Sequence, residues 1–185
     1  MPLVTERRFE TWPYIATGLL MIVLFWSRAI LHVVTVVRWP LELRHNFLYV
    51  AGTFVKALMF ASIADPVEWN SLGTFYGVVI WILFRSDVAL VRNAAVHSTS
   101  SAGRELFAAI ERDQFVNIRL VVPGIVATFG AASLVARLAP GWFLASGHVL
   151  FAVAQLACST VYLVSVMRFW SRLAPLISAS HEAEE

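Results

Sequence analysis

WFLASGHVLFAVAQLACSTVYLVSVMR, residues 142–168, is an apolar run with no acidic residue and no Lys or Arg before its last position. An α-helix needs roughly 20 predominantly apolar residues to cross the hydrocarbon core of a bilayer, and this run exceeds that length. It therefore predicts a membrane-spanning helix. Trp142 and Trp170 bracket it, as expected of tryptophan at the two membrane interfaces.

Four further apolar runs precede this one in the chain. We predict spanning helices over residues 12–37, 46–64, 70–92, 115–137 and 142–168. Proline-containing pairs that end helices separate several of the runs: Trp39-Pro40, Asp65-Pro66 and Pro140-Gly141. The sequence thus predicts an all-α integral membrane protein with about five transmembrane helices, in which residues 1–185 form a single polytopic domain.

The amino-acid composition excludes an ordinary soluble domain. Apolar residues make up 59% of the chain and charged residues 14%, against about 45–50% and about 25% in soluble proteins. The mean hydropathy is +0.72, and the basic pI of about 9.0 comes from arginines between the runs, without the basic stripe typical of nucleic-acid binding. Lysine occurs once, at Lys56, and this arginine-rich usage favours a bacterial origin. A lone cysteine, Cys158, excludes a disulfide within the chain.

Arginines between the runs predict the orientation in the membrane, because cytoplasmic loops are enriched in Lys and Arg. Alternate connections and the C-terminal segment carry the excess: Arg38, Arg44, Arg92, Arg104, Arg112, Arg168 and Arg172. The other connections hold Asp65 and Glu68 without a cation, and Arg137 alone. We therefore predict a multi-pass protein of the bacterial inner membrane, with its N-terminus outside and its C-terminus in the cytoplasm.

Two segments have more than one interpretation. Lys56, at the centre of the second run, costs about 2.5 to 3.5 kcal/mol of insertion free energy, so a re-entrant segment is the alternative to a full span. Residues 104–114 have an amphipathic pattern with Leu106 and Ile110 on the apolar face, after a flexible segment 98–103. We predict a short amphipathic cytoplasmic helix there, on the membrane surface or against a partner, with a plain solvated connector as the alternative.

Ionisable residues inside the spans are candidate functional residues, because a charge in the hydrocarbon core is costly. They are Arg28, His32, Lys56, Arg85, Asp87 and Arg119. Asp87 is the one carboxylate within a predicted span, so we predict that it forms an ion pair with Lys56. Arg28 is then left without a counter-charge in the chain, and we expect a basic intramembrane site for an anion, a lipid headgroup or an acidic partner. The alternative is that the arginines extend to the cytoplasmic headgroups.

Two helix faces predict packing or transport. On the fifth span, polar side chains recur on one face: His148, Gln155, Ser159 and Tyr162. This face indicates a pore or proton path, or else hydrogen bonds between helices. On the fourth span, four small residues recur at a spacing of four: Gly124, Thr128, Ala132 and Ala136. They predict the close approach of another helix.

Catalytic and cofactor patterns are missing from the sequence. It shows no nucleophile with its base, no paired carboxylates, no metal-ligand cluster and no phosphate-binding loop. Haem between His32 and His148 is disfavoured, because the two residues lie about 20 Å apart along the membrane normal. We therefore predict no catalytic residue, no metal and no cofactor.

The sequence favours a non-enzymatic membrane protein that acts as an oligomeric small channel or as an accessory subunit of a membrane complex. A phage-encoded holin-like or exclusion protein belongs to the same class. The expected partners are membrane lipid, further copies of the chain or subunits of a membrane complex, and no nucleic acid. The alternative is an integral membrane enzyme acting on a lipid, with His32, Asp87 or His148 as its base.

Overall fold

The computed structural model describes residues 8–35 and 43–182, and all regular secondary structure within them is helical. The elements, in chain order, are α1 (Arg8–Thr35), α2 (Leu43–Ala61), α3 (Pro66–His97), α4 (Ser101–Val116), η1 (Asn117–Val121), α5 (Val122–Leu138), α6 (Pro140–Trp142), η2 (Phe143–Gly147) and α7 (His148–Glu182). η1 and η2 are π-helical turns, which accommodate one residue more than an α-helical turn.

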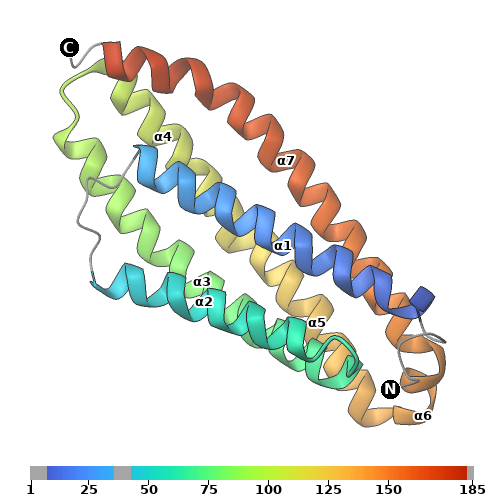
Figure 1. Ribbon diagram of the computed structural model, residues 1–185. Helices are drawn as coiled ribbons and strands as arrows, with labels where there is room; N and C mark the ends of the chain where they lie inside the picture. Colours follow the sequence, from blue (N-terminus) through green and yellow to red (C-terminus); the bar gives the residue numbers. More distant parts are fainter. Residues whose placement is uncertain (1–7, 36–42, 183–185) are drawn as a thin grey trace.

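The helices form a bundle of antiparallel passes (Figure 1): α1, α2, α3, the continuous pair α4–α5, and α7. Four segments are long and apolar enough to cross a membrane: Glu10–Leu31, Pro66–His97, Ser101–Leu138 and Pro140–Ser180. α2 contains a shorter apolar helix, Asn46–Ala61. The predicted all-α membrane fold is confirmed, and the start of α1 and the end of α7 lie at opposite ends of the bundle.

Three of these segments are much longer than the hydrocarbon core is thick. At about 1.5 Å per residue, the 32 residues of Pro66–His97 extend about 48 Å, the 38 residues of Ser101–Leu138 about 57 Å, and the 41 residues of Pro140–Ser180 about 61 Å. The core of a typical bilayer is about 30 Å thick. In a membrane, the bundle must therefore continue well beyond the hydrocarbon.

The turn between α2 and α3 follows directly from its sequence. The Asp65 side chain accepts hydrogen bonds from the backbone N–H groups of Val67 at 2.9 Å and Glu68 at 3.1 Å. Pro66 occupies the first position of α3, where its missing N–H is not needed. Asp65-Pro66 is thus both a stop for α2 and an N-cap for α3.

The connection between α3 and α4 differs from the prediction. Residues 104–114 are helical, as predicted, but they belong to a helix that begins at Ser101 and runs through η1 into α5 without a break. The hydroxyl of Ser100 caps this helix by accepting a hydrogen bond from the N–H of Gly103 at 3.0 Å. Since only residues 98–100 separate the two helices, α4 is part of the bundle rather than a separate surface helix.

An inward-facing stripe runs along both halves of the helix α4–η1–α5. Its members are Leu106, Ile110, Asp113 and Asn117 in the first half and Val122, Phe129, Ala132 and Ala136 in the second. Within each half the residues recur at helical steps of three, four or seven, whereas the step from Asn117 to Val122 is five. The π turn η1 supplies the extra residue, so both halves of the helix face the bundle.

Two buried clusters pack the bundle together. The larger cluster joins α1, α2, α3 and α5 and includes Tyr14, Phe25, Met59, Trp69 and Phe129. The smaller cluster lies where α3 ends and α4 begins, and consists of Leu31, Val91, Leu106, Ile110, Phe169 and Leu173. The apolar face predicted for residues 104–114 packs into this smaller cluster, which gives α4 its place in the bundle.

Close approach of α3 to α5 depends on two glycines of α3. A Cβ atom on Gly73 would overlap the ring of Phe129, and a Cβ atom on Gly77 would lie 2.5 Å from Cγ2 of Val126. Side chains larger than hydrogen would push the helices apart at both points. Such glycines are a common means of close helix packing in membranes.

Gly73→Ala is expected to lower the melting temperature of the purified protein in detergent, because overpacking costs about 1 to 3 kcal/mol. Gly141→Ala in α6 is the matched control, since a Cβ atom there meets no other atom within 4 Å. Thermal unfolding followed by circular dichroism measures both. Equal melting temperatures for the two variants would contradict the tight contact between α3 and α5.

Candidate functional site

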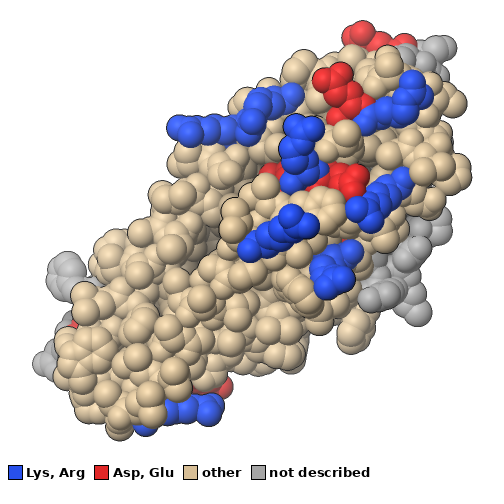
Figure 2. Space-filling view, turned by 180° about the vertical axis from the view of Figure 1, so that it is seen from behind, with Lys and Arg blue, Asp and Glu red and all other residues tan. Residues whose placement is uncertain are grey.

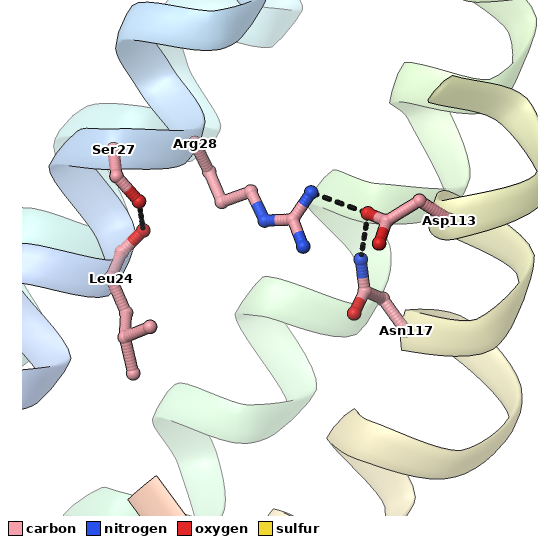
Figure 3. Close-up of polar contacts among 5 residues, drawn as sticks. All are labelled: Leu24, Ser27, Arg28, Asp113 and Asn117. Carbon is pink, nitrogen blue, oxygen red and sulfur yellow. Dashed lines mark hydrogen bonds and ion pairs between the residues drawn. The ribbon is translucent and has the colours of Figure 1, made fainter. Parts of the chain in front are cut away.

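Arg28 and Asp113 form a charged pair inside the bundle (Figure 3). Arg28, only 4% exposed, extends from α1, and its Nη1 donates a hydrogen bond to Oδ2 of Asp113 in α4. Asn117 of η1 donates to the same oxygen through its Nδ2 at 2.8 Å. The carboxylate therefore receives two donors, one of them charged.

The prediction that Arg28 has no counter-charge in the chain is wrong. Residues 104–114, which include Asp113, were predicted to form a separate surface helix, whereas α4 belongs to the bundle and carries Asp113 to Arg28. The sequence contains a signal for this position. Asp113 follows Leu106 and Ile110 at helical steps of seven and three, so it shares their buried face.

Two aromatic rings of α7 flank the Arg28 guanidinium. Its Cζ lies 5.8 Å from the ring centroid of Tyr162 and 5.3 Å from that of Phe169, distances typical of cation–π contact. The hydroxyl of Tyr162 is buried and interacts with the Arg28 guanidinium, and no described residue accepts a hydrogen bond from its O–H. Charge at this centre is thus balanced by Asp113, while the Tyr162 O–H remains available as a donor.

The predicted ion pair between Lys56 and Asp87 is also wrong. Gly52 of α2 lies against Ile80 of the antiparallel α3, so Lys56 and Asp87 lie in opposite directions from this contact. The two residues are therefore separated by about 16 Å along the bundle. The Lys56 ammonium instead lies 3.5 Å from the ring centroid of Phe25, in cation–π contact, and Asp87 is fully buried in α3.

The other charged candidates lie apart from the Arg28 centre. Arg85 is exposed above the Trp81 ring at 5.0 Å, and Arg119 is exposed above the Phe115 ring at 5.4 Å. Each arginine stacks on an aromatic residue one turn earlier in its own helix. His32 lies in α1, but its side chain is outside the described part of the structure, as are residues 36–42 with Arg38.

The polar face of α7 points into the bundle. Nδ1 of His148 lies 2.9 Å from the hydroxyl of Tyr14 in α1, and Nε2 of Gln155 donates to Oδ1 of Asn70 in α3 at 2.7 Å. Tyr162 lies beside Arg28, and Ser159 lines a cavity inside the bundle. These contacts correspond to the alternative in which the face forms hydrogen bonds between helices.

The row of small residues in α5 divides into two parts. Ala132 and Ala136 are buried and pack against Phe143 of η2 within the same chain. Thr128 is half-buried and donates to the backbone carbonyl of Ile125. Gly124 is exposed, with no atom near the position of a Cβ. One end of the row thus packs internally, while the other end faces outward.

A cavity of about 60 Å³ lies between α1, α2, α3, α5 and α7. Its lining is mostly apolar, and five residues contribute polar groups: Arg28, Tyr49, Tyr76, Ser159 and Tyr162. Apolar residues such as Met21 and Phe129 line the deeper part. A pocket that is mostly apolar with a few convergent polar groups is the usual form of a small-molecule site.

Among the described residues, no group of three or more His, Cys, Asp or Glu side chains is placed to hold a metal ion. Comparison with protein-family models, with curated proteins and with solved structures finds no match for this chain. The features of the molecule that bear on its function are the Arg28 centre, the cavity and the lipid-facing surface.

Asp113→Ala is expected to destabilise the protein by about 3 to 5 kcal/mol, because it leaves the buried guanidinium of Arg28 without a counter-charge. Arg28→Met combined with Asp113→Leu removes both charges and should be closer to the wild type. Chemical unfolding in detergent measures the two effects.

Glu111→Ala is the control for this experiment. It breaks the pair between Glu111 and Arg92, whose side chains are 28% and 59% exposed, and should cost no more than about 1 kcal/mol. An equal loss of unfolding free energy for Glu111→Ala and Asp113→Ala would show that the buried pair stabilises the protein no more than the exposed pair does.

Proposed function

We propose that this protein is a non-enzymatic, oligomeric membrane protein whose chains assemble through α5 and α7. One observation carries the proposal. The most apolar windows of Ser101–Leu138 and Pro140–Ser180 are 17% buried, whereas those of Glu10–Leu31 and Pro66–His97 are 50% buried. α5 and α7 therefore present most of their surface outside the bundle, to lipid or to another helix.

The residue types on this surface favour another helix. The outward faces carry small residues at helical spacing: Gly124, Ala127 and Ala131 on α5, and Ala154, Ala157 and Cys158 on α7. Small residues let helix backbones approach closely, and close packing drives helix association in lipid. α5 and α7 combine these small residues with exposed large ones, such as Leu134, Leu150 and Val161. On α1 the exposed residues are all large: Trp12, Ile15, Leu19, Val23, Trp26 and Ile30.

The channel and enzyme alternatives receive less support. The polar face of α7 is engaged inside the bundle, where His148 contacts Tyr14 and Gln155 contacts Asn70, so it does not line a path between chains. Of the residues considered as bases, Asp87 is fully buried and His148 is held by Tyr14. Because these polar groups are held inside the bundle, the channel and enzyme readings have less to rest on than the assembly role.

The charge distribution supports a cytoplasmic C-terminus in a bacterial inner membrane. Figure 2 shows arginines gathered on one half of the molecule, the half in which α3 ends, α4 begins and α7 ends. Exposed arginines of these segments include Arg92, Arg104, Arg112, Arg168 and Arg172. Asp65 and Glu68 lie at the opposite end, with Arg137. Arginine is enriched on the cytoplasmic side of membrane proteins.

Ala127→Leu is expected to reduce the mass observed by native mass spectrometry in detergent, from a multiple of the 20.6 kDa chain to a single chain. The larger side chain prevents close approach of a second α5. Ala89→Leu, an equal enlargement at an exposed position of α3, is the control and should leave the mass unchanged. A monomeric wild type, or a wild type that copurifies with a different chain, would contradict the homo-oligomer.

A reporter active only in the cytoplasm is expected to work when fused to the C-terminus and to fail when inserted at Ala64, in the turn between α2 and α3. The two sites lie at opposite ends of the bundle. Activity at Ala64 and none at the C-terminus would reverse the predicted orientation. Activity at both sites would place them on the same side of the membrane, so that the chain from α3 to α7 would cross it an even number of times.

A further inference from the structure

The cavity beside Arg28 has one polar end and an apolar body. Arg28 and Tyr162 lie at one end of the cavity. Along α1 the cavity extends from Arg28 to Met21, seven residues earlier in the chain. The distance between these two levels is about 10 Å. The free volume of about 60 Å³ is several times the roughly 10–15 Å³ that a single water requires.

The polar end of the cavity offers a hydrogen-bond donor but carries no net charge. Arg28 is 4% exposed and bonded to Asp113, so an anion would meet the carboxylate as well as the guanidinium. The guanidinium of Arg28 and the hydroxyl of Tyr162 interact with each other, and among the described residues nothing accepts a hydrogen bond from the Tyr162 O–H. Buried donors are normally satisfied, so this end of the cavity suits a neutral acceptor oxygen.

The level of this end matches the edge of the hydrocarbon core. Trp12 opens α1 on the opposite side of the bundle, and Arg28 lies 16 residues later, about 24 Å away. Since the core is about 30 Å thick and tryptophan marks its boundary, Arg28 lies within one turn or so of the far boundary. An oxygen bound there would belong to a molecule whose apolar part extends toward the bilayer centre.

The cavity approaches the surface of the bundle where its lining is only half-buried. These lining residues are Tyr49 on α2, Val121 and Ile125 on the segment η1–α5, and Ser159 and Tyr162 on α7, whereas the rest of the lining is buried. An apolar chain could therefore enter sideways from the bilayer without crossing a polar surface.

We propose that the cavity binds an apolar chain that carries a carbonyl oxygen, with the oxygen accepting a hydrogen bond from the Tyr162 hydroxyl beside Arg28 and the chain lying toward Met21 and Phe129. The ester carbonyl of a membrane lipid supplies this chemistry at the required depth, and the carbonyl of an isoprenoid-type quinone supplies it as well. The site lies within one chain, so it does not depend on the assembly proposed above.

Native mass spectrometry of the whole protein in detergent tests the proposal with three probes: dioleoylphosphatidylcholine, its diether analogue without ester carbonyls, and decylubiquinone. We expect the diester to be retained about fivefold more strongly than the diether, as one hydrogen bond would give. Displacement of the diester by an equimolar amount of decylubiquinone would identify the quinone as the better source of the carbonyl. Retention of the diester in its presence would identify the lipid.

Two variants locate the binding. Tyr162→Phe keeps the ring but removes the hydroxyl, and should lower retention of the diester toward that of the diether. Ser159→Leu fills the cavity and should abolish retention, whereas Thr160→Leu, one residue further and exposed, is the matched control and should retain the probe. Equal retention of diester and diether, or unchanged retention in both Tyr162→Phe and Ser159→Leu, would overturn the proposal.

Discussion

A guanidinium almost completely removed from water is the constraint on which the arrangement of the helices depends. An isolated buried charge costs several kcal/mol, and Arg28 avoids this cost only by meeting Asp113, which lies 85 residues later in the chain. For that contact to form, the polar segment before the fourth span must enter the bundle as a helix. The two buried clusters lie on either side of the pair, one deeper in the bundle and one toward the end where α4 begins.

α7 reinforces this arrangement with polar contacts at a regular interval. His148, Gln155 and Tyr162 follow one another at steps of seven residues, and each faces a polar residue of α1 or α3: Tyr14, Asn70 and Arg28. In a membrane, polar side chains are best placed against other helices, because lipid cannot form hydrogen bonds with them. Turning this face inward leaves the small residues of α7 on the outside, where they support the proposed assembly.

The same inward faces create the cavity. The segments that meet around it contribute aromatic and branched side chains of different lengths, and Arg28 reaches across its end toward α4. The π turn η1 keeps the two halves of its helix in phase, since it adds a residue where the inward stripe would otherwise rotate away from the bundle. The positions of the cavity and of the charged pair therefore both depend on helix phase.

Local properties of the sequence determined the membrane-spanning segments, the stop at Asp65-Pro66 and the recurrence of polar residues along one face of α7. Hydropathy, capping and helical period are all properties of neighbouring residues, so they can be read without a structure. Whether Arg28 meets Asp113, and whether Lys56 meets Asp87 or Phe25, was decided only by the tertiary structure. These pairings depend on the relative depth and rotation of helices, which follow from helix lengths, the extra residue of η1 and the continuity of α4 with α5.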